Sequence, residues 1–166
     1  MAQQARKKPF EGLRVADFAW VGVGPTVSKY LADHGAEVIR IESSTYPEAL
    51  RRVGPFVNDT PNIDGSGYYA NFNSSKLCMS VNFKHPRGPE LVRRLVAKCD
   101  VVTESYTPGT MARFGFDYES LSAGRDDLLM VSMPLYGQTG PWANYMGYGH
   151  VLQAAAIIAL QHHERF

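Results

Sequence analysis

The sequence contains little of what would mark a metal site or a disulfide-stabilised fold. It has only two cysteines, Cys78 and Cys99, and neither stands at a metal-ligand spacing. Its five histidines form no i, i+4 pair on a helix face. We therefore predict no metal site, and we interpret both thiols as small buried side chains of a protein in a reducing compartment.

Neither sign of charge dominates the chain, whose formal net charge is +1 with acidic and basic residues interspersed. Such a surface does not favour nucleic acid as a partner. The polar N-terminus lacks the apolar segment of a secretory signal, and the longest nearly apolar run, residues 151–160, is too short to span a bilayer. We therefore expect a cytoplasmic protein that binds neither nucleic acid nor membrane.

Two familiar motifs are missing or incomplete. No serine stands in a Gly-x-Ser-x-Gly elbow, so hydrolase chemistry is not indicated. Gly22 and Gly24 followed by Glu42 are similar to a dinucleotide-binding fingerprint, but Val27 stands where that motif has its third glycine. A β-branched residue there is expected to keep the helix away from the strand. An NAD-binding or FAD-binding Rossmann domain stays as an alternative.

What the sequence does contain is one clearly delimited βαβ unit near its start. A β-rich run over residues 14–20 leads through two glycines into a helix, which we expect to begin at Pro25 and to end at Gly35. A second strand over 37–42 follows. The turn between the first strand and the helix N-terminus is a place where phosphorylated ligands bind. The helix is expected to bury one apolar stripe, made of Val27, Tyr30 and Leu31.

The rest of the sequence predicts further strands and helices in alternation. Residues 43–67, rich in Pro, Gly, Asn and Asp, indicate a long surface excursion. Alternating strands and helices predict an α/β fold, Rossmann-like, with a mainly parallel sheet and flanking helices. The expected strands cover residues 77–83, 100–105 and 128–136. One expected helix starts near Pro86 or Pro89. Further helices are expected over 107–113, with Thr107 as N-cap and Pro108 as first residue, over 118–123 and over 148–164.

Several short motifs, in this order, resemble the class III CoA-transferases, a family that includes formyl-CoA transferase, carnitine CoA-transferases and α-methylacyl-CoA racemases. The resemblance covers roughly residues 10–156 and concerns only the N-terminal part of the family fold. It is carried by Phe10–Phe18, Val23–Pro25, Leu31–Glu42, Asn73–Lys76, Ser80–Lys84, Val101–Gly109, Arg113–Tyr118, Tyr136–Pro141, Gly147–Tyr148 and Gln153–Ala154.

The resemblance implies that coenzyme A is bound, with acyl-CoA and a carboxylic acid as substrates. CoA would lie across the first βα turn, and Lys84 is the expected partner of phosphate charge. The implied contacts are the backbones of Val21, Gly22 and Val23; Val81, Asn82, Phe83 and Lys84 at the adenosine end; Ser105, Tyr106 and Thr107 along the pantetheine; Arg113; and Met146 with Tyr148 closing over the thioester.

Some positions depart from the family pattern. Trp20 and Gly22 stand where formyl-CoA transferase has a histidine and a glutamine, so that specificity is not supported. Ser43 replaces a basic residue present in some members, which leaves one cation fewer for CoA phosphates. The racemases have a catalytic Gly-His-Asp motif, and the equivalent run here is Gly147–Gly149. Transferase chemistry is therefore favoured over racemase chemistry, which stays as an alternative.

The nucleophile implied by the resemblance is an aspartate that forms an aspartyl-CoA thioester. It belongs a few dozen residues after Tyr148, where this sequence has none, and we predict no catalytic residue within it. We expect a flexible tail over residues 1–9 and a CoA-binding domain over 10–166, truncated or internally shortened after about residue 156. The resemblance also implies a homo-oligomer, since complete members of the family pair as interlocked dimers. A non-catalytic CoA-binding or partner subunit, completed by another chain, is the alternative.

Overall fold

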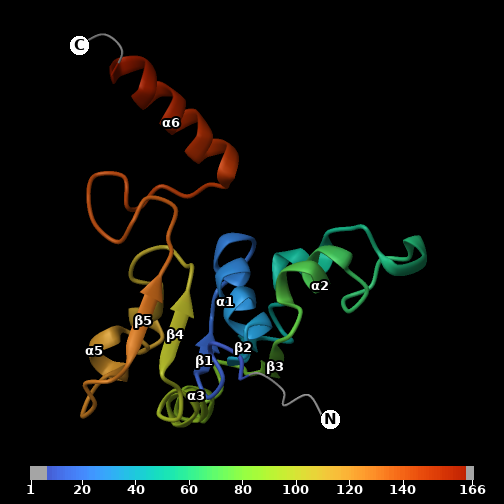
Figure 1. Ribbon diagram of the computed structural model, residues 1–166, viewed down its shortest axis with the longest axis vertical. Coiled ribbons are helices and arrows are strands. Elements are labelled where there is room, and N and C mark those ends of the chain that lie inside the picture. Colours follow the sequence, from blue (N-terminus) through green and yellow to red (C-terminus); the bar gives the residue numbers. More distant parts are fainter. Residues whose placement is uncertain (1–6, 164–166) are drawn as a thin grey trace.

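The structure, a computed structural model, describes the backbone of residues 7–163 and the side chains of residues 7–157. Its centre is a five-stranded sheet in the order β3-β2-β1-β4-β5, with every neighbouring pair parallel (Figure 1). This confirms the predicted Rossmann-like α/β class. The strands are β1 (Arg14–Asp17), β2 (Glu37–Glu42), β3 (Leu77–Ser80), β4 (Val101–Glu104) and β5 (Leu129–Ser132).

Helices cover both faces of the sheet, because neighbouring strand residues point to opposite sides. On one face Ala32 packs with Val15 and Val38, and on the other Val92 packs with Ala16. Each fully buried valine contributes about 1.5–3 kcal/mol, so this two-sided core is the main source of stability. The helices are α1 (Val23–Asp33), α2 (Gly67–Asn73), α3 (Gly88–Val96), α4 (Thr110–Arg113), α5 (Tyr118–Leu121) and α6 (Gly149–His163).

Several predicted boundaries are wrong in informative ways. β1 ends at Asp17 instead of residue 20, because the N–H of Ala19 donates to Asp17 Oδ1 at 3.0 Å. α1 begins at Val23, so Pro25 is its third residue; its missing N–H costs nothing there, since N–H groups of a first turn have no helical partner. β3 and β5 are likewise shorter than expected.

The predicted apolar stripe of α1 is also wrong. Val27 and Tyr30 are 37% and 63% exposed. The buried residues are the small ones, Gly24, Pro25, Ser28 and Ala32. Because α1 lies close to the sheet and the turn, only small side chains fit between them. Val27 therefore does not separate the helix from the strand, and its presence does not exclude a dinucleotide site.

Other expectations need correction too. α4 begins at Thr110 after Gly109, and not at the predicted Thr107–Pro108 pair. The excursion over 43–67 carries two short 3₁₀ helices (Ala49–Arg52 and Val57–Asp59), and it leads into α2, which the sequence analysis did not assign. Cys78 is exposed, so only Cys99 is the buried thiol that we expected.

The ends of the chain lie partly outside this description. Most of the predicted tail over residues 1–9 and the predicted last helical residue, Glu164, fall outside the described residues. Figure 1 shows α6 projecting beyond the carboxyl ends of the strands, away from the sheet. Within the described part of the chain, no helix is both long and apolar enough to cross a membrane.

Candidate functional site

The strand order creates a crevice between β1 and β4. From β1 the chain moves outward through β2 to β3, whereas β4 and β5 lie on the other side, so the loops after β1 and β4 part at this point. Ser105 joins the two loops, because its Oγ accepts the Trp20 N–H at 2.8 Å and donates to the Trp20 carbonyl at 3.0 Å. Ligands of open α/β sheets bind at such a switch point.

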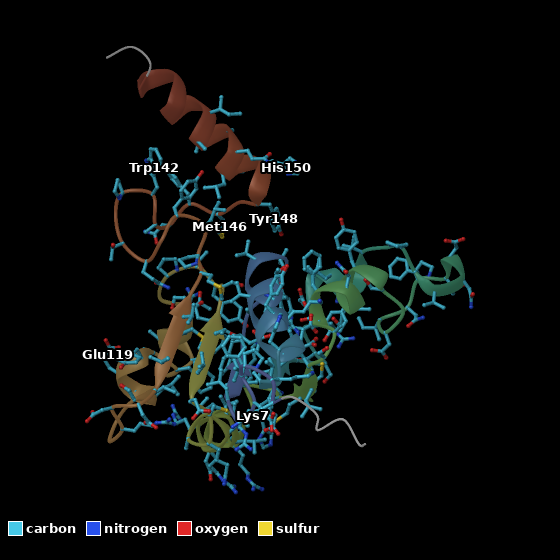
Figure 2. All side chains as sticks on the ribbon, in the orientation of Figure 1. Lys7, Glu119, Trp142, Met146, Tyr148 and His150 are labelled. Carbon is cyan, nitrogen blue, oxygen red and sulfur yellow. The ribbon has the colours of Figure 1, made fainter. Side chains whose placement is uncertain are left out.

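A hollow of about 470 Å³ opens at this crevice, and we call it the switch-point hollow. Trp20 forms part of its wall; the indole stacks on Tyr46 with ring centres 5.6 Å apart and lies 6.0 Å from the ring of Tyr106. Met146 and Tyr148 lie between the strand ends and α6 (Figure 2). The lining residues are Trp20, Ser105, Tyr106, Thr107, Pro108, Pro134, Leu135, Ala143, Tyr145, Met146, Gly147 and Tyr148.

The turn after β1 is tightly packed. A Cβ on Gly24 would collide with the Cβ of Ala19 and lie 3.0 Å from Ser105 Oγ, so a side chain does not fit there. Val21, just before the N-cap Gly22, has a left-handed φ of 61°. The first turn of α1 presents N–H groups and the positive end of the helix dipole to the crevice. The arrangement suits a ligand that carries negative charge.

Beneath the turn lies a group of buried charges that the sequence analysis missed. On the α1 face, β1, β2 and β4 each place a polar residue two positions after an inward valine: Asp17, Arg40 and Thr103. The strand register sets Asp17 directly beside the other two. The available sequence signal was a valine followed two residues later by a polar residue, which is charged in two of these three neighbouring parallel strands.

We call Asp17, Arg40, Glu48 and Lys76, with the hydroxyls of Ser28 and Thr103, the charge cluster, and its side chains hydrogen-bond or ion-pair with one another. Asp17 Oδ1 accepts from Thr103 Oγ1 at 2.9 Å, and its Oδ2 accepts from Ser28 Oγ at 2.8 Å and Lys76 Nζ at 3.0 Å. Arg40 forms ion pairs with Asp17 and with Glu48. In the part of the chain with described side chains, no buried polar side-chain atom lacks a partner. Such a network holds its members in one arrangement.

The environment shifts the pKa values of two glutamates in opposite directions. Burial raises the pKa of Glu48, against the opposing effects of Arg40 and the Val21 N–H. For Glu42, burial would also raise the pKa, but hydrogen bonds from Arg51 and Tyr69 outweigh it and lower the pKa below its usual value. Among the described residues, no three His, Cys, Asp or Glu side chains form a group that could hold a metal ion.

The structure divides the predicted site residues into two groups. Around the switch-point hollow lie Ser105, Tyr106, Thr107, Met146 and Tyr148. The turn residues Val21, Gly22 and Val23 adjoin Trp20 without lining the hollow themselves.

The second group lies where β3 and α4 end. Val81 is buried in the core, and Phe83 packs there against Phe114 with ring centres 5.2 Å apart. Lys84 and Arg113, which flank this ring pair in sequence, are exposed. Asn82 is exposed too, and its Oδ1 accepts the Lys84 N–H at 3.0 Å. In this group the side chains of Asn82, Lys84 and Arg113 are therefore the ones available to a ligand.

Fold and site together define a Rossmann-like α/β domain with a ligand crevice at its switch point. The model of the family described as CoA-transferase family III matches residues 10–162, and the chain belongs to this family.

Relatives and solved structures agree with this assignment. The chain is 40% identical to a succinate–glutarate CoA-transferase of Agrobacterium fabrum, over 89% of this chain and 38% of that enzyme. It is 38% identical to a succinyl-CoA:glutarate CoA-transferase of Mus musculus, over 93% of this chain and 34% of that enzyme. A CAIB/BAIF family protein from Brucella suis has a similar structure, with a TM-score of 0.81 at 36% identity, over 90% of this chain and 39% of that one. The chain thus spans less than two fifths of these relatives.

Proposed function

We propose that this chain is the CoA-binding portion of an acyl-CoA:carboxylate CoA-transferase that acts in the cytoplasm. The observation that carries the proposal is the family match over residues 10–162, a range that includes the first βα turn and the residues proposed to contact CoA. The hollow at the switch point is large enough for part of a thioester ligand. CoA would run from the exposed cations Lys84 and Arg113, past the Val21–Val23 turn, toward Met146 and Tyr148.

The chemistry implied by the resemblance is nucleophilic catalysis by an aspartate. Its carboxylate attacks the thioester carbonyl, which forms a mixed anhydride and releases CoA thiolate. The thiolate then attacks the aspartyl carbonyl, so that the aspartyl-CoA thioester forms and the donor carboxylate leaves. The acceptor carboxylate repeats both steps in the reverse direction.

We place that aspartate outside these 166 residues. The carboxylates near the crevice are already engaged: Glu104 accepts from the Tyr106 N–H at 2.7 Å and from Gln138 at 3.1 Å. Asp17 and Glu48 are buried in the charge cluster. This chain alone is therefore expected to bind CoA without transferring it, as either an incomplete enzyme or a subunit completed by another chain.

We also propose that the protein associates with a second copy. The segment from Tyr145 to α6 leaves apolar side chains exposed, with Met146 at 78% and Tyr148 at 66%. A single soluble chain seldom leaves such a continuous apolar stretch in water. Association would cover it.

Calorimetry with CoA and with NAD tests the proposed function, and we expect saturable binding of CoA only.

Lys84→Ala and Arg113→Ala should each weaken CoA binding about ten-fold or more, because a charge-assisted hydrogen bond to phosphate contributes roughly 1.5–3 kcal/mol. The effect of Lys84→Ala should shrink with dephospho-CoA if Lys84 holds the 3′-phosphate. Lys98→Ala is the matched control, since Lys98 is exposed and precedes the amino end of β4, whereas the candidate site lies at the carboxyl ends of the strands. Binding of NAD without CoA would reject the proposal.

A further inference from the structure

The turn after β1 holds a backbone conformation that its sequence does not favour. Val21 has a φ of 61°. The left-handed region costs an L-residue about 1–2 kcal/mol and is unusual for a β-branched side chain. Since Val21 stands between Trp20, which lines the switch-point hollow, and the N-cap Gly22, its conformation sets the direction in which the turn faces the crevice. Contacts with the surrounding structure must therefore stabilise the left-handed conformation of Val21.

Glu48 makes the contact that holds the turn. Its Oε1 accepts the Val21 N–H at 2.8 Å, although 27 positions separate the two residues. Its Oε2 is ion-paired with Arg40, and both side chains are 0% exposed. Arg40 also donates to the carbonyl of Ala19 at 2.8 Å. Glu48 is thus fixed at both oxygens, and its acceptor cannot turn away from Val21.

Trp20 is held from the other side as well, through the two hydrogen bonds of Ser105. Ser105 lines the hollow, whereas Glu48 and Arg40 do not. Glu48 therefore acts on the crevice only through the backbone of the turn.

We propose that Glu48 is a positioning residue of the CoA site, which acts by holding Val21 in its left-handed conformation. Arg40 serves this role by fixing the Glu48 carboxylate. The inference rests on the proposed function, since it takes CoA as the ligand of the turn.

The expected size of the effect follows from the cost of the conformation. At about 1–2 kcal/mol, the unsupported turn would be left-handed in roughly 3–16% of the molecules, which is about a tenth in the middle of that range. Apparent affinity falls by the fraction that is competent to bind. Loss of the Glu48 acceptor should therefore raise the Kd for CoA about ten-fold.

The test compares four variants of the full chain by calorimetry with CoA. Glu48→Met, which has no acceptor oxygen, should weaken binding about ten-fold. Glu48→Gln keeps one acceptor oxygen for two donors, the Val21 N–H and Arg40, and should weaken binding less than Glu48→Met does. Val21→Gly alone is the reference for the double variant, because its affinity shows what loss of the Val21 side chain does by itself. Val21→Gly combined with Glu48→Met should regain most of the lost affinity, because glycine adopts a positive φ at little cost. Loss of an ion pair to Arg40 alone would not be rescued by a change at Val21.

A second readout does not need CoA. With Trp142 replaced by phenylalanine, the remaining tryptophan is Trp20, since the sequence has two. Its emission should shift in Glu48→Met and return in the double variant with Val21→Gly.

The outcomes separate the two proposals. Two results would overturn the positioning role alone, provided that the wild type binds CoA. One is an affinity for CoA in Glu48→Met equal to that of the wild type, and the other is a loss of affinity that Val21→Gly does not restore. Failure of the wild type to bind CoA would overturn the proposed function, and with it a role of Glu48 in CoA binding. If Glu48→Met does not fold, Val21→Pro decides, because proline can neither donate nor adopt a positive φ. Near-wild-type affinity in Val21→Pro would then refute the inference.

Discussion

Replacing Lys76 with methionine tests whether the buried charges act as one unit. The Lys76 side chain is 0% exposed. Its Nζ donates to Asp17 at 3.0 Å, to the Pro25 carbonyl at 2.9 Å, to Ser28 at 2.8 Å and to Asn73 at 2.9 Å. These partners belong to β1, α1 and α2, so one ammonium group joins three elements. Methionine keeps an unbranched apolar chain but removes the charge and all of these bonds.

The expected loss is large. Removing one partner of a buried ion pair costs about 3–5 kcal/mol, because the other charge remains buried. Arg40 stays near Asp17 but at 3.5 Å, so it compensates only in part. For a chain of this size each kcal/mol corresponds to about 2–4 °C, and the Tm should fall by roughly 6–20 °C. Thermal and urea unfolding followed by circular dichroism measure this, with exposed Lys98→Met as the control, expected within about 0.5 kcal/mol of the wild type.

A double-mutant cycle decides whether the reasoning is right. Asp17→Asn combined with Lys76→Met removes both charges of the pair, so the combined loss should be smaller than the sum by about 0.5–3 kcal/mol. Additive losses would mean that the two charges do not support each other. A loss below about 1 kcal/mol in Lys76→Met alone would refute the idea that the pair needs its cation.

Two further results are expected. Arg51→Met should move acid unfolding to higher pH. The lowered pKa of Glu42 stabilises the folded protein above the unfolded pKa of this group, and this stabilisation is lost as the pH falls through the folded pKa. The hydrogen bond from Arg51 is a main cause of the lowered pKa, so its removal should raise the pH at which the stabilisation is lost. Circular dichroism between neutral and acidic pH measures it, and a midpoint equal to that of the wild type would contradict it. Sedimentation velocity should show association that increases with concentration, because Met146 and Tyr148 are exposed; a compact monomer at every concentration would count against it.

Much of the architecture could be predicted from the sequence, because local signals and the fold agree. Glycines, prolines and β-rich runs indicated the βαβ unit, and the alternation of elements indicated a parallel sheet. The inward face of α1 could not be predicted from hydrophobic periodicity. Close approach to the sheet selects small residues such as Gly24 and Ser28, which carry no apolar signal.

The candidate site could be predicted only in part, from family motifs and not from local structural signals. The family motifs indicated positions such as Ser105 and Tyr148, which the structure does bring to one hollow. Their contacts with CoA stay a prediction. The buried charge cluster was missed because residues such as Asp17 and Lys76 are usually exposed, and only the strand register shows that they meet.

The charge cluster also constrains when the protein can fold as it is synthesised. Asp17 meets Lys76, 59 residues later in the chain, and Thr103, 86 residues later. Until both have left the ribosome, the Asp17 carboxylate has only Ser28 and Arg40 as side-chain partners within the first βαβ unit. We therefore expect the charge cluster to be completed only after β4 has been synthesised. Pairing of β1 with β4, which joins Val15 to Val101, is therefore expected to form late, as contacts between distant parts of a chain do.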